Sequence, residues 1–261
     1  MLFRSGEQRE ITVLFSDIRG FTTVSESLTP PELVTLLNEY LSPMTRIVLE
    51  EQGTLDKFIG DAVMAIFNAP LDVPAHALHA CTAAVKMLEE LKQLNQGFTE
   101  RGMQTLDIGI GINTGPAVVG NMGADIRFDY TAIGDAVNLA SRLEGLNKYY
   151  GSHILISEDT YKQLPEGSFT FREVDRVRVK GKHLPVVMFE LMIANHELLP
   201  RFTAGLEAYR AQQFAEARSI FEALTDEYGD GPSRLYRDRC SDYLVIPPPA
   251  DWDGVYTAKS K

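Results

Sequence analysis

Short apolar runs alternate with longer amphipathic segments along the first two thirds of the chain, and this alternation restricts the possible folds more than any other feature of the sequence. The run 11–16 is compact and mostly apolar, which indicates a buried strand. The runs 55–59 and 62–67 flank Gly60-Asp61, a pair that favours the tight turn of a β-hairpin. Strands and helices therefore both build the main part of the protein.

Helices are predicted between these strands from capping residues and from the spacing of apolar positions. Pro30 and Pro31 suit the first turn of a helix, with Thr29 as its N-cap. Within the strand predicted at 108–113, Gly109 and Gly111 indicate that another backbone approaches closely. The same signals predict helices near 74–94, 134–149 and 158–164, and strands at 116–122, 154–156, 169–179 and 186–192.

The composition changes after about Asn195, where a helical segment begins. Residues 204–228 have helical spacing, and the stretch 209–221 resembles the second half of a tetratricopeptide-type helical hairpin. One copy is present, whereas repeat solenoids need about three or more. We therefore predict two domains, 1–194 and 195–261, the second a small C-terminal helical appendage that packs on the first; a partner-binding repeat is the alternative. The candidate apolar face consists of Phe202, Leu206, Tyr209, Phe214, Ala217, Ile220, Phe221 and Leu224.

The net charge disfavours one broad class of partner. The 261 residues include 25 Lys+Arg and 36 Asp+Glu, which give a formal net charge of −11. An acidic total disfavours a general nucleic-acid binder, because such proteins present a basic surface to the phosphates. The total charge does not exclude a local site for a small anion.

Cysteine use and hydropathy favour a cytoplasmic location. Cys81 and Cys240 lie far apart in the sequence, and neither belongs to a CxxC motif, so a zinc site or a disulfide framework is not expected. No apolar stretch approaches the about 18–20 residues that span a bilayer. The first predicted strand begins almost at the start of the chain. We therefore expect a catalytic piece of a longer parent protein, whose upstream regulatory domain lies outside this chain. A membrane anchor in that longer protein is compatible with this expectation.

Two carboxylates stand where predicted strands end. Asp17 follows the run 11–16 directly, and Asp61 occupies the turn of the predicted hairpin. If the hairpin pairs beside the first strand, the two carboxylates repel each other, and a divalent cation relieves that repulsion. Mg²⁺ typically uses one or two carboxylates together with substrate phosphates. Taken singly, each residue could equally cap or form an ordinary turn.

Two further groups of residues suit recognition of a nucleotide. Asn138 and Arg142 lie four positions apart in the predicted helix, so they project from one face and could contact a ribose and a phosphate. Lys180 and Lys182 flank Gly181 at a predicted strand end and could hold an anion. A solvated helix face and a solvated hairpin tip are the alternatives for these two groups.

Four strings carry these residues in a fixed order: FSDIRGFT, KFIGDAVMAIF, YTAIGDAVNLASRLE and VRVKGK. Together they closely resemble the catalytic domain of class III nucleotidyl cyclases, over roughly residues 10–192. The resemblance implies an α+β fold, a ferredoxin-like β-α-β sheet with flanking helices on one side. It also implies head-to-tail dimers with active sites at the interface.

The resemblance assigns one part of the site to the residues around the first strand end. Asp17 and Asp61 match the two metal-binding aspartates, and the carbonyl group of Ile18 assists them. Phe21 and Thr22 follow in the same motif, and since free backbone N–H groups just after Asp17 could meet phosphate oxygens, we expect these two residues to bind the substrate. The implied cofactors are two Mg²⁺ (or Mn²⁺) ions in each active site.

The remaining assignments concern the base, the ribose and the transferring phosphate. Lys57 matches the lysine that reads the base, and Thr131 falls at its partner position. Asn138 and Arg142 match the pair that orients the ribose and stabilises the pentavalent phosphorus. Lys180 matches the lysine that holds the terminal phosphates. Since all these residues occur on one chain, we predict a homodimer in which each composite site takes its aspartates from one copy and the other residues from the second.

Base chemistry favours ATP as the substrate. A lysine donates hydrogen bonds and a threonine hydroxyl can accept one, which suits N1 and the 6-amino group of adenine. Guanine would ask for a carboxylate facing its N1–H, and Lys57 stands at that position. We therefore predict an adenylate cyclase. The alternatives are a guanylate or dual-specificity cyclase, a non-catalytic nucleotide-binding regulatory module, and a docking module built on the C-terminal helices. Thr131 in place of aspartate also resembles the bicarbonate-responsive subgroup, which makes bicarbonate an effector to test.

Overall fold

The computed structural model describes residues 6–124, 126–177, 186–249 and 251–255. These residues form two compact units, each described by itself. The first comprises Met1–Lys148 and His153–Glu166, and the second comprises Tyr149–Ser152 and Gly167–Lys261. Within the described ranges, none of the helices combines the length and the apolar character that crossing a lipid bilayer demands.

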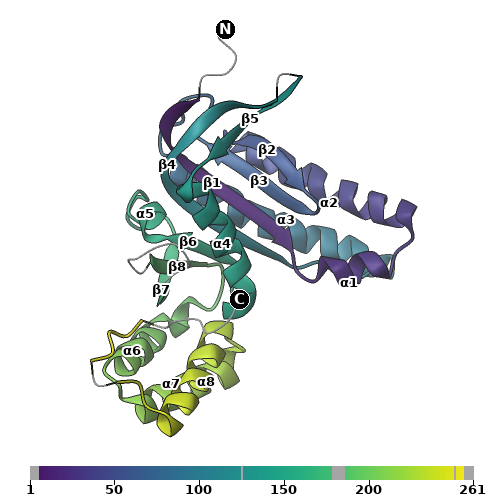
Figure 1. The fold of residues 1–261 in the computed structure, drawn as a ribbon. Helices are drawn as coiled ribbons and strands as arrows, with labels where there is room; N and C mark the ends of the chain where they lie inside the picture. Colours follow the sequence, from purple (N-terminus) through teal and green to yellow (C-terminus); the bar gives the residue numbers. More distant parts are fainter. Residues whose placement is uncertain (1–5, 125, 178–185, 250, 256–261) are drawn as a thin grey trace. The chain divides into compact units, whose positions relative to one another are not determined.

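The first unit is built on a sheet whose strands run in the order β2-β3-β1-β4-β6. The first four of these strands pair in antiparallel fashion, and β4 pairs with β6 in parallel. This order with the intervening helices is the predicted ferredoxin-like β-α-β arrangement, so the predicted α+β fold class is confirmed (Figure 1). The strands are β1 (Glu7–Ile18), β2 (Thr54–Ile59), β3 (Ala62–Phe67), β4 (Ile108–Ala124), β5 (Arg127–Ile133), which pairs with β4, and β6 (Ile154–Ser157).

Helices cover both faces of this sheet. On one face lie α2 (Pro30–Glu50) and α3 (His76–Glu100), and the hydroxyl groups of Ser16 and Tyr40 are 3.3 Å apart there. On the other face lies α4 (Asp135–Tyr150), which approaches β4 so closely that a Cβ atom at Gly111 would overlap the backbone of Glu144. The close approach expected at Gly111 is therefore confirmed, whereas the expectation of helices on one side is wrong. The shorter helices are α1 (Phe21–Glu26) and α5 (Glu158–Tyr161).

The two strands predicted at 108–113 and 116–122 are one continuous strand, β4, so this prediction is wrong. Proline usually interrupts a ladder because it lacks an N–H group. Here the pairing of β4 with β6 ends at Ile112, and the pairing with β5 begins at Val118. Pro116 lies between these two registers while it remains opposite Glu10 of β1, so the strand passes through it.

The second unit combines the antiparallel pair β7 (Thr170–Val177) and β8 (Val186–Met192) with three helices. The single helical segment predicted at 204–228 is divided at Gln212, whose φ of 60° ends the first helix, and the third helix was not predicted. The predicted apolar face is buried in one cluster. The helices are α6 (Leu199–Arg210), α7 (Phe214–Tyr228) and α8 (Gly231–Val245), preceded by the short 3₁₀ turn η1 (His196–Leu198). The predicted domain boundary at 194/195 stays a prediction; the compact units divide the chain before β7.

Buried ion pairs join the strands of this unit to its helices. The guanidinium group of Arg172 in β7 donates two hydrogen bonds, of 2.9 and 2.7 Å, to the carboxylate of Asp230 at the start of α8. Arg239 of α8 donates a 2.6 Å bond to Asp175 of β7, and the hydroxyl group of Tyr150 donates to the same carboxylate. Since buried charges are stable only when paired, these bonds make the strand pair and the helices one structural unit.

Candidate active site

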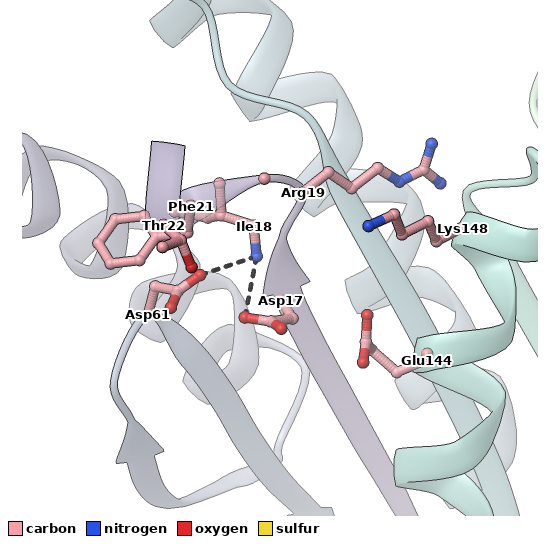
Figure 2. A pocket seen from close by; sticks show the side chains of 10 residues that line it. Asp17, Ile18, Arg19, Phe21, Thr22, Asp61, Glu144 and Lys148 are labelled. Carbon is pink, nitrogen blue, oxygen red and sulfur yellow. Dashed lines mark hydrogen bonds between the residues drawn. The ribbon is translucent and has the colours of Figure 1, made fainter. Parts of the chain in front are cut away.

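The pairing of β1 with β3 brings the two predicted metal ligands together. Ser16 lies opposite Val63 in this register, so the end of β1 meets the turn that carries Asp61. The backbone N–H group of Ile18 donates to Asp17 Oδ1 at 3.1 Å and to Asp61 Oδ2 at 3.2 Å (Figure 2). Two carboxylates from distant parts of the sequence therefore contact one amide. The proposed role of the Ile18 carbonyl group stays a prediction.

A pocket with a volume of about 330 Å³ opens beside these carboxylates. Gly20, with a φ of 67°, forms the turn that leads into α1, and Phe21 and Thr22 at the start of that helix line the pocket. Glu144 and Lys148 extend from α4 toward the same space (Figure 2). These last two were not predicted, although their spacing of four positions on a helix was a usable signal. The lining residues are Asp17, Ile18, Arg19, Gly20, Phe21, Thr22, Asp61, Glu144, Gly145 and Lys148.

The pocket disfavours negative charge on its carboxyl groups. Burial and the neighbouring Asp61 carboxylate raise the pKa of Asp17 from its ordinary value of 3.8 to about 7. Burial and the charge of Asp17 likewise raise the pKa of Glu144 to about 7. The guanidinium group of Arg19, which also lines the pocket, pairs with the carboxylate of Asp107 at 2.9 Å. A divalent cation between the carboxylates would favour their ionised forms.

The donor set suits magnesium bound together with a substrate. Within the described residues, no cluster of three or more His, Cys, Asp or Glu side chains could hold a metal ion by itself. Mg²⁺ does not need one, because it typically binds through one or two carboxylates and completes its shell with water and phosphate oxygens. Asp17 and Asp61 therefore fit Mg²⁺ or Mn²⁺, the ions predicted from the sequence.

The two predicted base-reading residues meet at a third side chain. Lys57 lies on β2 and Thr131 on β5, far apart in the sequence. The Thr131 hydroxyl donates a hydrogen bond of 2.5 Å to Asp56 Oδ2, and the Lys57 ammonium lies 3.3 Å from Asp56 Oδ1. The structure therefore brings the predicted pair together through Asp56, a residue that sequence analysis missed.

The remaining predicted residues lie elsewhere. Asn138 and Arg142 are exposed on α4 and, in the described part of the chain, are not among the residues that line the pocket. Lys180 falls within 178–185, outside the described residues, so its role stays a prediction. The chain thus carries a carboxylate pocket and, apart from it, a set of polar residues suited to base and phosphate.

The comparison with known families identifies the family of the chain. The sequence model described as "Adenylate and Guanylate cyclase catalytic domain" matches residues 3–193. The chain belongs to this cyclase family. The predicted recognition of a class III cyclase catalytic domain is confirmed, and the chain is an enzyme domain of that kind.

Individual relatives include both adenylyl and guanylyl cyclases. The chain is 37% identical over 244 residues to "Adenylate cyclase, terminal-differentiation specific" of Dictyostelium discoideum, a match that covers 89% of this chain and 11% of the relative. It is 41% identical to the crystal structure of the adenylyl cyclase CyaB from P. aeruginosa, with a TM-score of 0.67 over 73% of this chain and 97% of that one. It is 39% identical to the guanylyl cyclase Cya2, with a TM-score of 0.65 over 71% and 93% of the two chains.

The matches cover a small part of the curated relatives but most of this chain. The cyclase domain spans 11–37% of the length of the curated relatives that it matches first, so those relatives contain much more than this region. The match to the Dictyostelium protein covers more of this chain than residues 3–193 contain, and it therefore extends past residue 193 toward the C-terminal helices of the second unit.

Proposed function

We propose that this cyclase domain converts ATP to 3′,5′-cyclic AMP and pyrophosphate at a site shared by two copies of the chain. The observation that supports ATP over GTP is the meeting of Lys57 and Thr131 at one buried carboxylate, since these two side chains match the hydrogen-bonding groups of adenine. A cytoplasmic location belongs to the same proposal.

The carboxylate pocket would take the triphosphate end of ATP. Asp17 and Asp61, with the Ile18 carbonyl, would hold two Mg²⁺ or Mn²⁺ ions. Bound there, the ions supply Lewis acidity that lowers the pKa of the ribose 3′-hydroxyl and neutralises the triphosphate. Phe21 and Thr22, which open α1 and line the pocket, would donate hydrogen bonds from their backbone N–H groups to the phosphate oxygens.

The polar residues of the second copy would orient the reacting groups. Asn138 would hold the ribose so that its 3′-oxygen faces the α-phosphorus, and the guanidinium group of Arg142 would stabilise the charge that develops on the transferring phosphate. Lys180 would hold the terminal phosphates. The reaction forms the 3′-O–P bond, breaks the bond to pyrophosphate and needs no protein nucleophile.

The two faces of α4 support a composite site. Glu144 and Lys148 line the pocket of their own chain, whereas Asn138 and Arg142 are exposed on the same helix and absent from that lining among the described residues. A second copy related by a two-fold axis could place its exposed Asn138 and Arg142 at this pocket and receive the equivalent residues in return.

The test is a direct assay for product. The purified chain is incubated with ATP or GTP and Mg²⁺ or Mn²⁺, and cyclic AMP and cyclic GMP are quantified over a range of protein concentrations. We expect cyclic AMP from the native chain and none from Asp61→Ala. A preference for GTP would support the guanylyl alternative, and nucleotide binding without any product would support the non-catalytic one. Adding bicarbonate to the same assay tests the predicted effector.

A further inference from the structure

An irregularity in β2 places a carboxylate beside the proposed base-reading pair. The register of β2 against β3 shifts between Leu55 and Lys57, so Asp56 is the extra residue of a β-bulge. Neighbouring side chains of a regular strand point to opposite faces, and a bulge can re-aim one of them. The Lys57 ammonium accordingly lies 3.3 Å from the carboxylate of the residue next to it.

The carboxylate of Asp56 is fully buried. Its side chain is 0% exposed, whereas that of Lys57 is 40% exposed. Its Oδ2 accepts the hydrogen bond from Thr131, and its Oδ1 accepts no hydrogen bond from the part of the chain that the structure describes, so the Lys57 ammonium is the charge that faces it. Burying a carboxylate is costly unless it is paired, and here both partners belong to the proposed base-reading pair.

This contact fixes what the Thr131 hydroxyl can do. A hydroxyl group has one proton to donate and two lone pairs that accept. The proton of Thr131 is donated to Asp56, so toward a ligand this hydroxyl can only accept. The 6-amino group of adenine donates a hydrogen bond, whereas O6 of guanine accepts one. Without Asp56 the hydroxyl could rotate and serve either base.

We propose that Asp56 is a positioning residue for base specificity, which keeps the Thr131 hydroxyl an acceptor and holds the Lys57 ammonium beside it, so that the pair accepts adenine and rejects guanine. The inference rests on the proposed function of Lys57 and Thr131 in reading the base. Asp56 acts through these two side chains and contacts no substrate itself.

The decisive variant is Asp56→Asn, which keeps the shape of the side chain. Its amide group can donate to Thr131, which frees the hydroxyl proton to turn toward O6 of guanine. We expect the ratio of kcat/KM for ATP to kcat/KM for GTP to fall about tenfold, because a mispaired buried donor or acceptor is strongly disfavoured. Equal losses with both nucleotides, at an unchanged ratio, would indicate a merely structural role and overturn the proposal.

Three further variants make the test specific. Glu51→Gln alters another largely buried carboxylate, which pairs with Lys86, and should leave the ratio unchanged. Thr131→Ser keeps the hydroxyl and should retain the preference for ATP. In a Thr131→Val background, Asp56→Asn should cause no further change in the ratio, because the group through which it acts is gone.

The same design remains decisive if Asp56→Asn fails to fold. Thr131→Val alone should then lower kcat/KM for ATP without an equal loss for GTP, and an unchanged ratio would contradict the proposal. Displacement of a fluorescent nucleotide by ATP and by GTP measures base preference in binding even without turnover. A native chain that makes no cyclic nucleotide contradicts the proposed function, whereas a native chain that prefers ATP and an Asp56→Asn variant that keeps this preference contradict the role of Asp56.

Discussion

Asp17 is held where its ionised form is disfavoured. Half-burial and the Asp61 carboxylate raise its pKa to about 7. Because the folded chain binds this proton more tightly than the unfolded chain does, the linked stability is present at low pH. It is lost as the pH rises from the ordinary pKa of 3.8 through about 7, where Asp17 ionises in the fold.

Replacing Asp17 by asparagine should therefore separate stability from activity. We expect Asp17→Asn to raise the free energy of unfolding at pH 8, in the presence of a chelator, by about 1–2 kcal/mol, a value reduced because part of the group contacts solvent. The gain should shrink toward pH 5, and cyclase activity should be lost. Urea unfolding at both pH values checks this, with Glu89→Gln on the exposed face of α3 as control. A variant less stable than the native chain at pH 8 would contradict it.

Sequence reasoning located some site residues and missed others for a physical reason. Asp17 and Asp61 were predictable because strand ends and tight turns can be recognised from short patterns. Asp56 was not, because a residue next to Lys57 would face the opposite side of a regular strand, and the bulge that re-aims it depends on pairing with β3. Glu144 joins the pocket only through the packing of α4 on β4.

Among the elements, the contact between β4 and α4 depends on a glycine, which has no side chain. A Cβ atom at Gly111 would overlap the backbone N of Glu144 and the carbonyl O of Ala140, and backbone atoms cannot yield as a flexible side chain does. Gly111→Ala should force α4 away from the sheet and lower the free energy of unfolding by about 2 kcal/mol or more. Thermal and urea denaturation measure this loss.

A matched glycine provides the control for this substitution. A Cβ atom at Gly97 of α3 would meet nothing within 4 Å. Since alanine favours a helix more than glycine does, Gly97→Ala should stabilise the chain by about 0.5–1 kcal/mol. Similar effects of the two substitutions would contradict the importance of the β4–α4 contact.

The buried ion pair between β7 and the start of α8 leads to a second prediction at the level of elements. Asp230 binds the buried guanidinium of Arg172 and also accepts a bond of 2.9 Å from the backbone N of Ser233, so it both neutralises a charge and caps α8. Asp230→Ala should cost about 3–5 kcal/mol because it leaves a buried arginine with one fewer partner. The exposed pair of Arg201 and Glu227, at 2.6 Å, is the control, and Glu227→Ala should cost about 1 kcal/mol or less.

Urea unfolding of these two variants checks the prediction, and equal losses would contradict it.

The prediction of helices from the sequence was weakest after Asn195, because the break between two helices there depends on how they pack. Helical spacing alone suggested one long helix at 204–228, but the turn at Gln212 allows α6 and α7 to bury their aromatic side chains against each other, as in the contact of Phe202 with Phe221 at 5.5 Å. Such a break depends on tertiary packing.

For the whole molecule, a net charge of −11 and an anionic substrate are compatible because the attraction is local. Arg19 and Lys148 line the pocket that contains Asp17 and Asp61, and the proposed metal ions would add positive charge there. Charged side chains within the pocket would contact a bound nucleotide directly. Charges elsewhere on the protein are screened beyond about 8–10 Å at physiological ionic strength. The acidic total therefore bears on polynucleotide binding and not on one metal-bound nucleotide.

The composite site makes the last prediction, which concerns two copies together. Asp17→Ala removes a metal ligand, and Arg142→Ala removes the group proposed to come from the other copy, so each variant alone should be nearly inactive. Equal mixing with free subunit exchange would make half of the dimers mixed, and each mixed dimer would hold one intact site. Activity should therefore recover to about a quarter of the native level.

A second mixture tests whether this recovery has the proposed origin. Asp17→Ala and Asp61→Ala alter the same half of the site, so every site in their mixed dimer keeps one defect and no activity should return. Cyclic AMP formation measures both mixtures, and native mass spectrometry of differently tagged copies confirms exchange. Recovery in the second mixture would mean that Asp17 and Asp61 of one site come from different copies, which contradicts the proposed division of the site. No recovery in the first mixture despite exchange would mean that each chain carries a complete site of its own. In that case Arg142 would have to reach the pocket of its own chain from the exposed face of α4, and a single-chain site would replace the shared one.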